Sequence, residues 1–207
     1  ISGIPGSPTD QDGVPFTLTE EFASVYRMHP LVPDELQLYS ATTGLPLGDK
    51  RLMKDMLFHN SQNVLLNEEA SLADIFYSFG ISHPGAITLQ NHPDFMYDLE
   101  ITRPDGSQDR VDLGTIDILR DRERGVPRYN EFRQRFHRPP VKCFEDVTGG
   151  NLDKADLIRS VYGKDADGKD NVNLLDLMVG LYAEPLPYKF GFSDTAFRVF
   201  ILMASRR

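Results

Sequence analysis

The chain has 207 residues, of which 40% are hydrophobic and 26% are charged, and its formal net charge is −9 at pH 7. This length and composition predict a globular protein with one sizeable core or two small ones. The negative charge, without a basic stripe among aromatic residues, argues against a nucleic-acid partner, and the single cysteine, Cys143, excludes an intrachain disulfide.

The start of the chain is rich in glycine, proline and serine, and we interpret residues 1–13 as a linker ahead of one domain over residues 14–207. No apolar run approaches the roughly 20 residues that cross a bilayer, and residues 1–13 lack the basic and apolar regions of a signal peptide. We therefore expect a soluble chain. The sequence assigns it to no compartment and leaves association with a membrane open.

Helical patterns dominate the rest of the chain. Thr17 and Glu20 fit a capping box, in which the Thr17 hydroxyl and the Glu20 carboxylate each accept from the other residue's backbone. Apolar residues then recur at helical spacing through Met28, and Pro30 discourages continuation. Further helices are predicted over residues 50–60, 71–79, 86–90, 112–124, 129–136, 151–162, 173–183 and 193–207.

One segment has a strand pattern. Residues 99–112 are predicted to form a hairpin that turns at Pro104-Asp105-Gly106. No repeat of fixed period is present, so a solenoid is not indicated. The predicted fold class is therefore mainly α, with at most a minor β-hairpin.

The segment from Tyr26 to Pro30 holds the first candidate site. A spacing of three on a helix would place Tyr26 and His29 on one face, with a phenol and an imidazole about one turn apart. These residues fit a buried tyrosine and a histidine that caps a helix end. They also fit a metal or haem ligand with a redox-capable phenol beside it. Spacing alone leaves both interpretations open.

The stretch from Glu20 to His29, followed by Leu31-Val32-Pro33-Asp34, resembles the proximal-helix motif of animal-type haem peroxidases. In the cyclooxygenase and α-dioxygenase branches of that superfamily, a radical-forming tyrosine stands three residues before the iron-binding histidine. Tyr26 matches the tyrosine and His29 matches the proximal ligand. Ordinary peroxidases of the superfamily usually lack this tyrosine, so Tyr26 favours a dioxygenase.

Four later segments match the fatty-acid α-dioxygenases in the same order, so that the resemblance covers nearly the whole chain from Gly13 onward. They are residues 75–80 with 91–93, 117–133, 176–184 and 192–207. The resemblance implies a helical, cyclooxygenase-like catalytic domain, of which residues 14–207 are the proximal-side portion. In the superfamily the distal histidine and the usual calcium loop lie upstream. Nothing before Gly13 resembles them, so we expect the N-terminal half of the haem domain, with any calcium site, to lie outside this chain.

The resemblance also implies roles for two residues of the helix at 112–124. Asp117 matches a position near the second nitrogen of the proximal histidine, which is commonly an asparagine in the family. Arg120 matches the arginine that pairs with a haem propionate, a role suited to a permanently charged guanidinium. The alternative for Asp117 is an exposed helix residue, and the alternative for Arg120 is a solvated face of mixed charge.

The final predicted helix carries a candidate substrate anchor. Arg207 extends an apolar stripe with steps of three, four and three, and a fatty-acid carboxylate needs an arginine at the end of an apolar groove. The stripe consists of Phe197, Phe200, Ala204 and Arg207. Family spacing from Ser205, which would lie near the substrate chain, selects Arg207 as the anchor. Arg206 can also serve, and a simply solvated terminal arginine is the alternative.

Several other features are interpreted as structural. Residues 165–170 are typical of a polar turn, because a calcium loop there would lack carboxylates at its first and twelfth positions. Cys143 has no partner histidine nearby in sequence. The remaining histidines show no spacing of a joint metal site and are expected to be packing or surface residues. They are His59, His83, His92 and His137.

The leading hypothesis is a haem-dependent fatty-acid dioxygenase with haem b as its cofactor. The resemblance implies that oxidised haem takes an electron from Tyr26, that the tyrosyl radical removes a hydrogen from the carbon next to the carboxylate, and that O2 adds to give a 2-hydroperoxy acid, an oxylipin. His29 would hold the iron. Two alternatives stay open: a general haem peroxidase that uses H2O2, and a catalytically silent helical fragment that serves binding or interaction.

Overall fold

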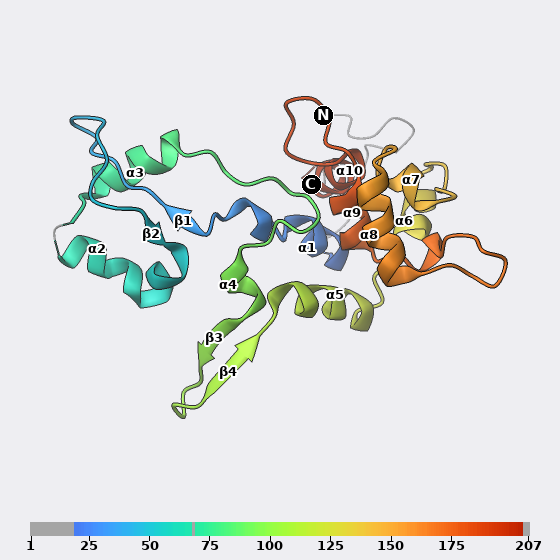
Figure 1. The fold of residues 1–207 in the computed structure, drawn as a ribbon, viewed down its shortest axis with the longest axis horizontal. Helices are drawn as coiled ribbons and strands as arrows, with labels where there is room; N and C mark the ends of the chain where they lie inside the picture. Colours follow the sequence, from blue (N-terminus) through green and yellow to red (C-terminus); the bar gives the residue numbers. More distant parts are fainter. Residues whose placement is uncertain (1–18, 68, 205–207) are drawn as a thin grey trace, which may run out of the picture. The chain divides into compact units, whose positions relative to one another are not determined.

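The computed structural model describes residues 19–67 and 69–204. Over these residues helices predominate, and the strands form two small two-stranded sheets (Figure 1). The predicted mainly α class is confirmed. The described residues fall into two compact units: unit 1 takes in residues 19–28, 87–90 and 113–204, and unit 2 takes in residues 29–86 and 91–112. The predicted linker and Thr17 lie outside the described residues.

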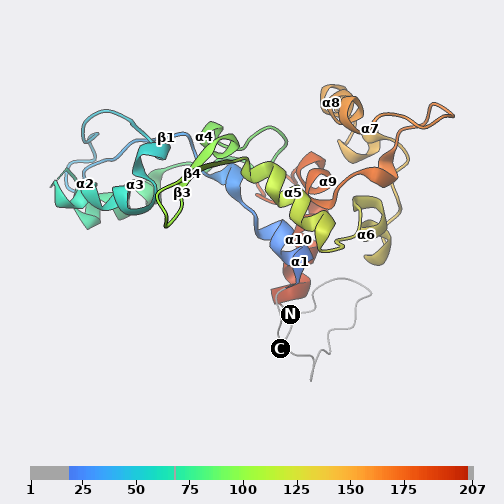
Figure 2. The same cartoon turned by 90° about the horizontal axis from the view of Figure 1, so that it is seen from below.

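Unit 1 is a set of helices around one core. They are α1 (Glu20–Tyr26), α5 (Leu113–Glu123), α6 (Tyr129–Arg135), α7 (Phe144–Val147), α8 (Leu152–Tyr162), the 3-10 turn η4 (Val172–Leu174), α9 (Leu177–Ala183) and α10 (Asp194–Ala204). Helix α1 packs against α5, α9 and α10, and Figure 2 shows α1 beside α10. Tyr129, Phe144 and Leu175 are fully buried in this unit.

Unit 2 combines short helices with the two sheets. Its elements are η1 (His29–Leu31), β1 (Glu35–Leu36), β2 (Arg51–Leu52), η2 (Met53–Met56), η3 (Phe58–Gln62), α2 (Asn63–Leu66), α3 (Leu72–Ile81), α4 (Asp94–Tyr97), β3 (Leu99–Thr102) and β4 (Gln108–Val111). A small core forms from Leu36, Leu38, Val64 and Ala70. The predicted hairpin is confirmed as β3 and β4, with Leu99 opposite Val111. Among the described residues, no helix has the length and apolarity that crossing a membrane requires.

The helix predictions succeed where a local signal starts or stops the helix. Ser71 and Asp74 form a capping box at the start of α3, and Asn151 caps α8 by accepting from the backbone of Lys154. Gly125, at a φ of +72°, follows α5. Helix α9 begins later than expected because Leu175 and Asp176 are extended.

Two predicted helices are wrong. Over residues 50–60, Arg51 and Leu52 pair with β1 and the chain then makes 3-10 turns, so strand pairing overrides the helical pattern. Residues 86–90 contain no regular element. They end at Gln90, whose positive φ of 56° interrupts a helix.

Helix α1 is shorter at both ends than the sequence predicts. Thr19 is its N-cap and accepts a hydrogen bond from the Phe22 backbone, whereas the capping box was expected at Thr17. The helix ends at Tyr26, and His29 begins the separate turn η1. The predicted placement of Tyr26 and His29 on one helical face is therefore wrong.

A close contact between α6 and α9 gives a test of the unit 1 core. A Cβ atom at Gly180 would lie 2.2 Å from Cδ2 of the Tyr129 ring. That ring is fully buried, and its hydroxyl donates to Glu184, so it has little freedom to move. Gly180→Ala is expected to lower the free energy of unfolding by about 1–3 kcal/mol through overpacking.

The matched control is Gly80→Ala on α3, where a Cβ would meet nothing within 4 Å. We expect this change to stabilise by up to about 1 kcal/mol, because alanine favours a helix over glycine. Urea unfolding followed by circular dichroism measures both. Equal stability of the two variants would contradict the close packing of Gly180 on Tyr129.

Candidate active site

Tyr26 is the last residue of α1, and its side chain is 57% exposed. Its ring stacks on Phe22 with centroids 5.2 Å apart and an interplanar angle of 26°. Phe22 in turn stacks on Phe200 of α10 at 6.1 Å, and Phe200 stacks on Phe192 at 6.0 Å. The phenol therefore has one face packed on Phe22, while much of its remaining surface is exposed over the residues that the structure describes.

The backbone after Tyr26 is held by two buried groups of unit 1. The Tyr182 hydroxyl of α9 donates a hydrogen bond to the Arg27 carbonyl at 2.5 Å. The Arg27 guanidinium forms an ion pair with Asp117 of α5, and both side chains are largely buried. Burial raises the pKa of Tyr182 above its usual range, so its hydroxyl stays protonated and able to donate.

Two more contacts tie α1 to α5. The Ser24 hydroxyl donates to Asp121 at 2.5 Å, and both residues are buried. Glu20 accepts from Arg120 at 3.1 and 3.3 Å at the exposed edge. Burial raises the pKa of the Asp121 carboxyl, an effect that the hydrogen bond from Ser24 and the charge of Arg27 partly oppose.

In unit 2, the chain just after His29 is held by residues of the loop that follows α3. The Gly85 backbone donates to the Leu31 carbonyl at 3.1 Å, and a Cβ at Gly85 would lie only 2.1 Å from the Pro30 carbonyl oxygen. Asn91 donates to the same Pro30 carbonyl at 3.4 Å. Only glycine permits this approach of two backbones, so the path of η1 is fixed by close packing.

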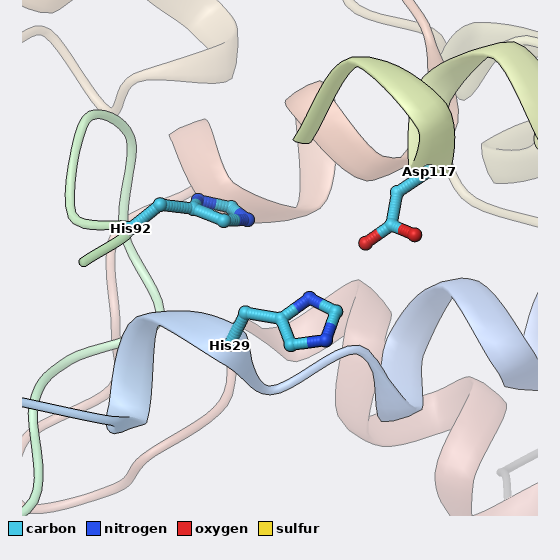
Figure 3. Close-up of side chains that lie close together, drawn as sticks. All are labelled: His29, His92 and Asp117. Carbon is cyan, nitrogen blue, oxygen red and sulfur yellow. The ribbon is translucent and has the colours of Figure 1, made fainter. Parts of the chain in front are cut away.

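His29 shares its surroundings with a second histidine of unit 2. Figure 3 shows the imidazole of His92 near that of His29; their ring centroids are 6.0 Å apart and the rings are tilted by 49°. Burial lowers the pKa of His92, and the neighbouring His29 lowers it further, whereas Asp112 raises it. Sequence reasoning missed this neighbour. The two residues are 63 positions apart, and the segment 91–93 carried only a family resemblance.

Two candidate site residues, Asp117 and Arg120, lie on α5. Asp117, drawn in Figure 3, is 2% exposed, so the alternative of an exposed helix residue is wrong. Arg27 is one partner of its carboxylate. Arg120 lies at the surface, where it forms an ion pair with Glu20.

The predicted substrate anchor is only partly visible. Ser205, Arg206 and Arg207 lie outside the described residues. The buried residues of α10 include Thr195, Ala196, Val199 and Met203. Phe197 and Phe200 of the predicted stripe are half-buried and join the aromatic row beside α1.

Comparisons with known proteins match this chain to animal haem peroxidases and alpha-dioxygenases. The family model for animal haem peroxidases matches residues 4–207. The chain is 43% identical to alpha-dioxygenase PIOX of Oryza sativa over 100% of this chain and 34% of the relative. It is 42% identical to alpha-dioxygenase 1 of Capsicum annuum over 96% of this chain and 31% of the relative. The chain thus spans about a third of the length of the curated relatives that it matches.

Solved structures give the same result. A crystal structure of fatty acid alpha-dioxygenase from Oryza sativa, a Tyr-to-Phe variant with palmitic acid, matches with a TM-score of 0.81 and 40% identity. The match covers 94% of this chain and 32% of that one. Peroxidase A from Dictyostelium discoideum matches with a TM-score of 0.70 at 20% identity, which shows a shared fold.

The buried contact between Ser24 and Asp121 predicts a pH dependence of stability. Because the folded-state pKa of Asp121 is raised above the ordinary value of 3.8, the folded chain holds this proton more tightly than the unfolded chain. Its contribution to stability is therefore greatest below pH 3.8 and is lost as pH rises through the raised pKa. Asparagine does not titrate, so we expect the stability of Asp121→Asn relative to that of the wild type to increase as the pH rises from 3.8 through the raised pKa of Asp121.

Ser24→Ala is the complementary variant, because it removes a hydrogen bond that lowers the pKa of Asp121. It is expected to extend the loss of stability to higher pH. Urea unfolding of the three proteins across pH measures these differences. Parallel pH profiles for wild type and Asp121→Asn would rule out a raised pKa at this contact.

Proposed function

This chain belongs to the animal haem peroxidase family, and on that premise we propose that it supplies the radical-forming tyrosine and the proximal iron ligand of a fatty-acid α-dioxygenase. The proposal rests on the position of Tyr26. This residue ends α1 three residues before His29, its ring stacks on Phe22, and its side chain is largely exposed. The curated relatives that the chain matches at about 40% identity are named alpha-dioxygenases, which favours this function over a general peroxidase or a silent scaffold.

The residues around His29 fit a haem ligand. Its imidazole is partly exposed and therefore reachable, and imidazole is a usual axial donor to haem iron. The close contact of Gly85 with Pro30 and the hydrogen bond from Asn91 hold the backbone that carries it. We propose haem b as the cofactor; when bound, it supplies the oxidising equivalent of the reaction.

Tyr26 would carry out the hydrogen transfers. Its phenol, having lost an electron and a proton, takes a hydrogen atom from the carbon next to the fatty-acid carboxylate. O2 adds to that carbon, and the resulting peroxyl radical takes a hydrogen atom back from Tyr26. The net change is insertion of O2 into one C–H bond, which yields a 2-hydroperoxy acid and regenerates the tyrosyl radical.

The remaining predicted site residues have supporting roles in this proposal. An arginine, Arg207 or Arg206, would bind the fatty-acid carboxylate near Ser205 and set which carbon faces Tyr26. Palmitic acid in the rice relative supports a fatty acid as the substrate class. Arg120 would have to leave Glu20 to pair with a haem propionate. Asp117 would act through Arg27, its partner in unit 1.

The test separates haem binding from oxygenation. In the haem-loaded full-length protein, Tyr26→Phe is expected to keep the Soret band but to lose at least about 100-fold in 2-hydroperoxy acid formation, because phenylalanine does not form the radical. His29→Ala is expected to shift or abolish the Soret band. Optical spectra and chromatography of the products measure both effects.

Tyr188→Phe is the matched control, because Tyr188 is 89% exposed and lies in unit 1 without a place in the aromatic row beside α1. It should keep full activity. If Tyr26→Phe forms 2-hydroperoxy acid at the wild-type rate, the radical role is wrong. A protein that reduces H2O2 equally well in all these variants and never oxygenates fatty acids would instead be a general peroxidase.

A further inference from the structure

We propose that Tyr182 is a positioning residue: its hydrogen bond to the Arg27 carbonyl sets the turn that ends α1 and thereby aims the phenol of Tyr26. This inference rests on the proposed function for the role of Tyr26. Tyr182 lies 155 residues from Arg27 in the chain and belongs to α9. It touches neither substrate nor haem in the proposed reaction, so its effect must pass through the backbone.

The first support is the conformation of Arg27. Its φ of −77° and ψ of 77° are those of the central residue of an inverse γ-turn. The Met28 backbone donates to the Tyr26 carbonyl at 2.9 Å, which is the hydrogen bond of such a turn. The chain therefore leaves α1 through a tight turn directly after Tyr26.

The hydrogen-bond partners of the carbonyl groups at the end of α1 also support this role of Tyr182. The last carbonyls of a helix lack partners within the helix. The Tyr26 carbonyl is satisfied within the turn, and the Arg27 carbonyl is satisfied by Tyr182, whose side chain is almost fully buried. Without that hydroxyl, the Arg27 carbonyl would lose its partner in a poorly hydrated place, which favours another backbone conformation.

The third support is that the Arg27 side chain is held independently. Its guanidinium pairs with the buried Asp117 of α5 while its carbonyl binds Tyr182 of α9. The two attachments come from different helices and together limit rotation about both sides of Arg27. The Tyr26 ring is supported by Phe22 on one face and is otherwise open, so its direction depends on this backbone.

The rate of hydrogen abstraction depends on the direction in which the Tyr26 ring points. The reacting atoms must approach to roughly 3–3.5 Å, and a displacement of about 1 Å can cost about 100-fold in rate. In Tyr182→Phe, which removes one hydroxyl and keeps the ring, we expect kcat for 2-hydroperoxy acid formation to fall about 10- to 100-fold. KM and the Soret band should stay as in the wild type.

Two readouts separate positioning from loss of stability. The electron paramagnetic resonance spectrum of the tyrosyl radical should change its β-methylene splitting in Tyr182→Phe, because that splitting reports how the ring is turned on the backbone. Hydrogen exchange of the Met28 amide should become faster, with or without haem, because this amide closes the turn. Asp117→Asn weakens the second attachment and should move both readouts in the same direction.

Tyr162→Phe is the matched control. Tyr162 is also in unit 1, and its hydroxyl donates to Asp176 at 2.7 Å, away from the end of α1. This variant should lose stability while keeping the wild-type radical spectrum and Met28 exchange. The inference is overturned if Tyr182→Phe leaves both readouts unchanged, or changes only stability as Tyr162→Phe does.

The outcome also distinguishes this inference from the proposed function. A wild-type radical signal that disappears in Tyr26→Phe but is unaltered in Tyr182→Phe overturns the positioning role and keeps the function. If no radical signal depends on Tyr26, both the proposed function and the positioning role of Tyr182 are wrong. Faster Met28 exchange in Tyr182→Phe would then show only that the hydroxyl maintains the turn.

Discussion

The hydrogen bond from Tyr182 and the ion pair with Asp117 converge on Arg27, one of the two residues between the candidate radical site and the candidate iron ligand. Helix α1 ends at Tyr26, so Tyr26 and His29 belong to different elements. On the other side of this turn, in unit 2, Gly85 packs against the Pro30 carbonyl and fixes the path of η1. Backbone contacts thus constrain the chain beside Tyr26 within unit 1 and the chain beside His29 within unit 2.

These constraints belong to a wider pattern in unit 1, where buried carboxylates organise the helices. Each is bound by arginine or hydroxyl groups from other elements: Asp117 by Arg27, Asp121 by Ser24, Asp176 by Arg122, Arg128 and Tyr162, and Glu184 by Tyr129, Arg133 and Thr195. Burying a carboxylate is costly, and removing one partner of a buried ion pair typically costs about 3–5 kcal/mol. Such ion pairs therefore penalise alternative helix arrangements. The Arg27–Asp117 ion pair and the Ser24–Asp121 hydrogen bond are the two buried contacts that hold α1.

Local signals made part of this structure predictable. Ser71 and Asn151 mark helix starts, Asp105-Gly106 marks the hairpin turn, and the motif around Tyr26 and His29 carries the family resemblance. The end of α1 was not predictable, because its cause is Tyr182, a residue that only the fold brings to Arg27. His92 was missed for the same reason: a lone histidine has no pattern, and packing alone brings it to His29. The helix expected over 50–60 was wrong because pairing with β1 outweighs local propensity.

Resonance Raman spectroscopy of the reduced, haem-loaded protein shows whether His29 or His92 is the ligand of the haem iron. If His29 is the ligand, the iron–histidine stretching band is lost in His29→Gly, returns when imidazole is added, and persists in His92→Gly. A band that persists in His29→Gly without imidazole, or that is lost in His92→Gly alone, would contradict His29 as the ligand.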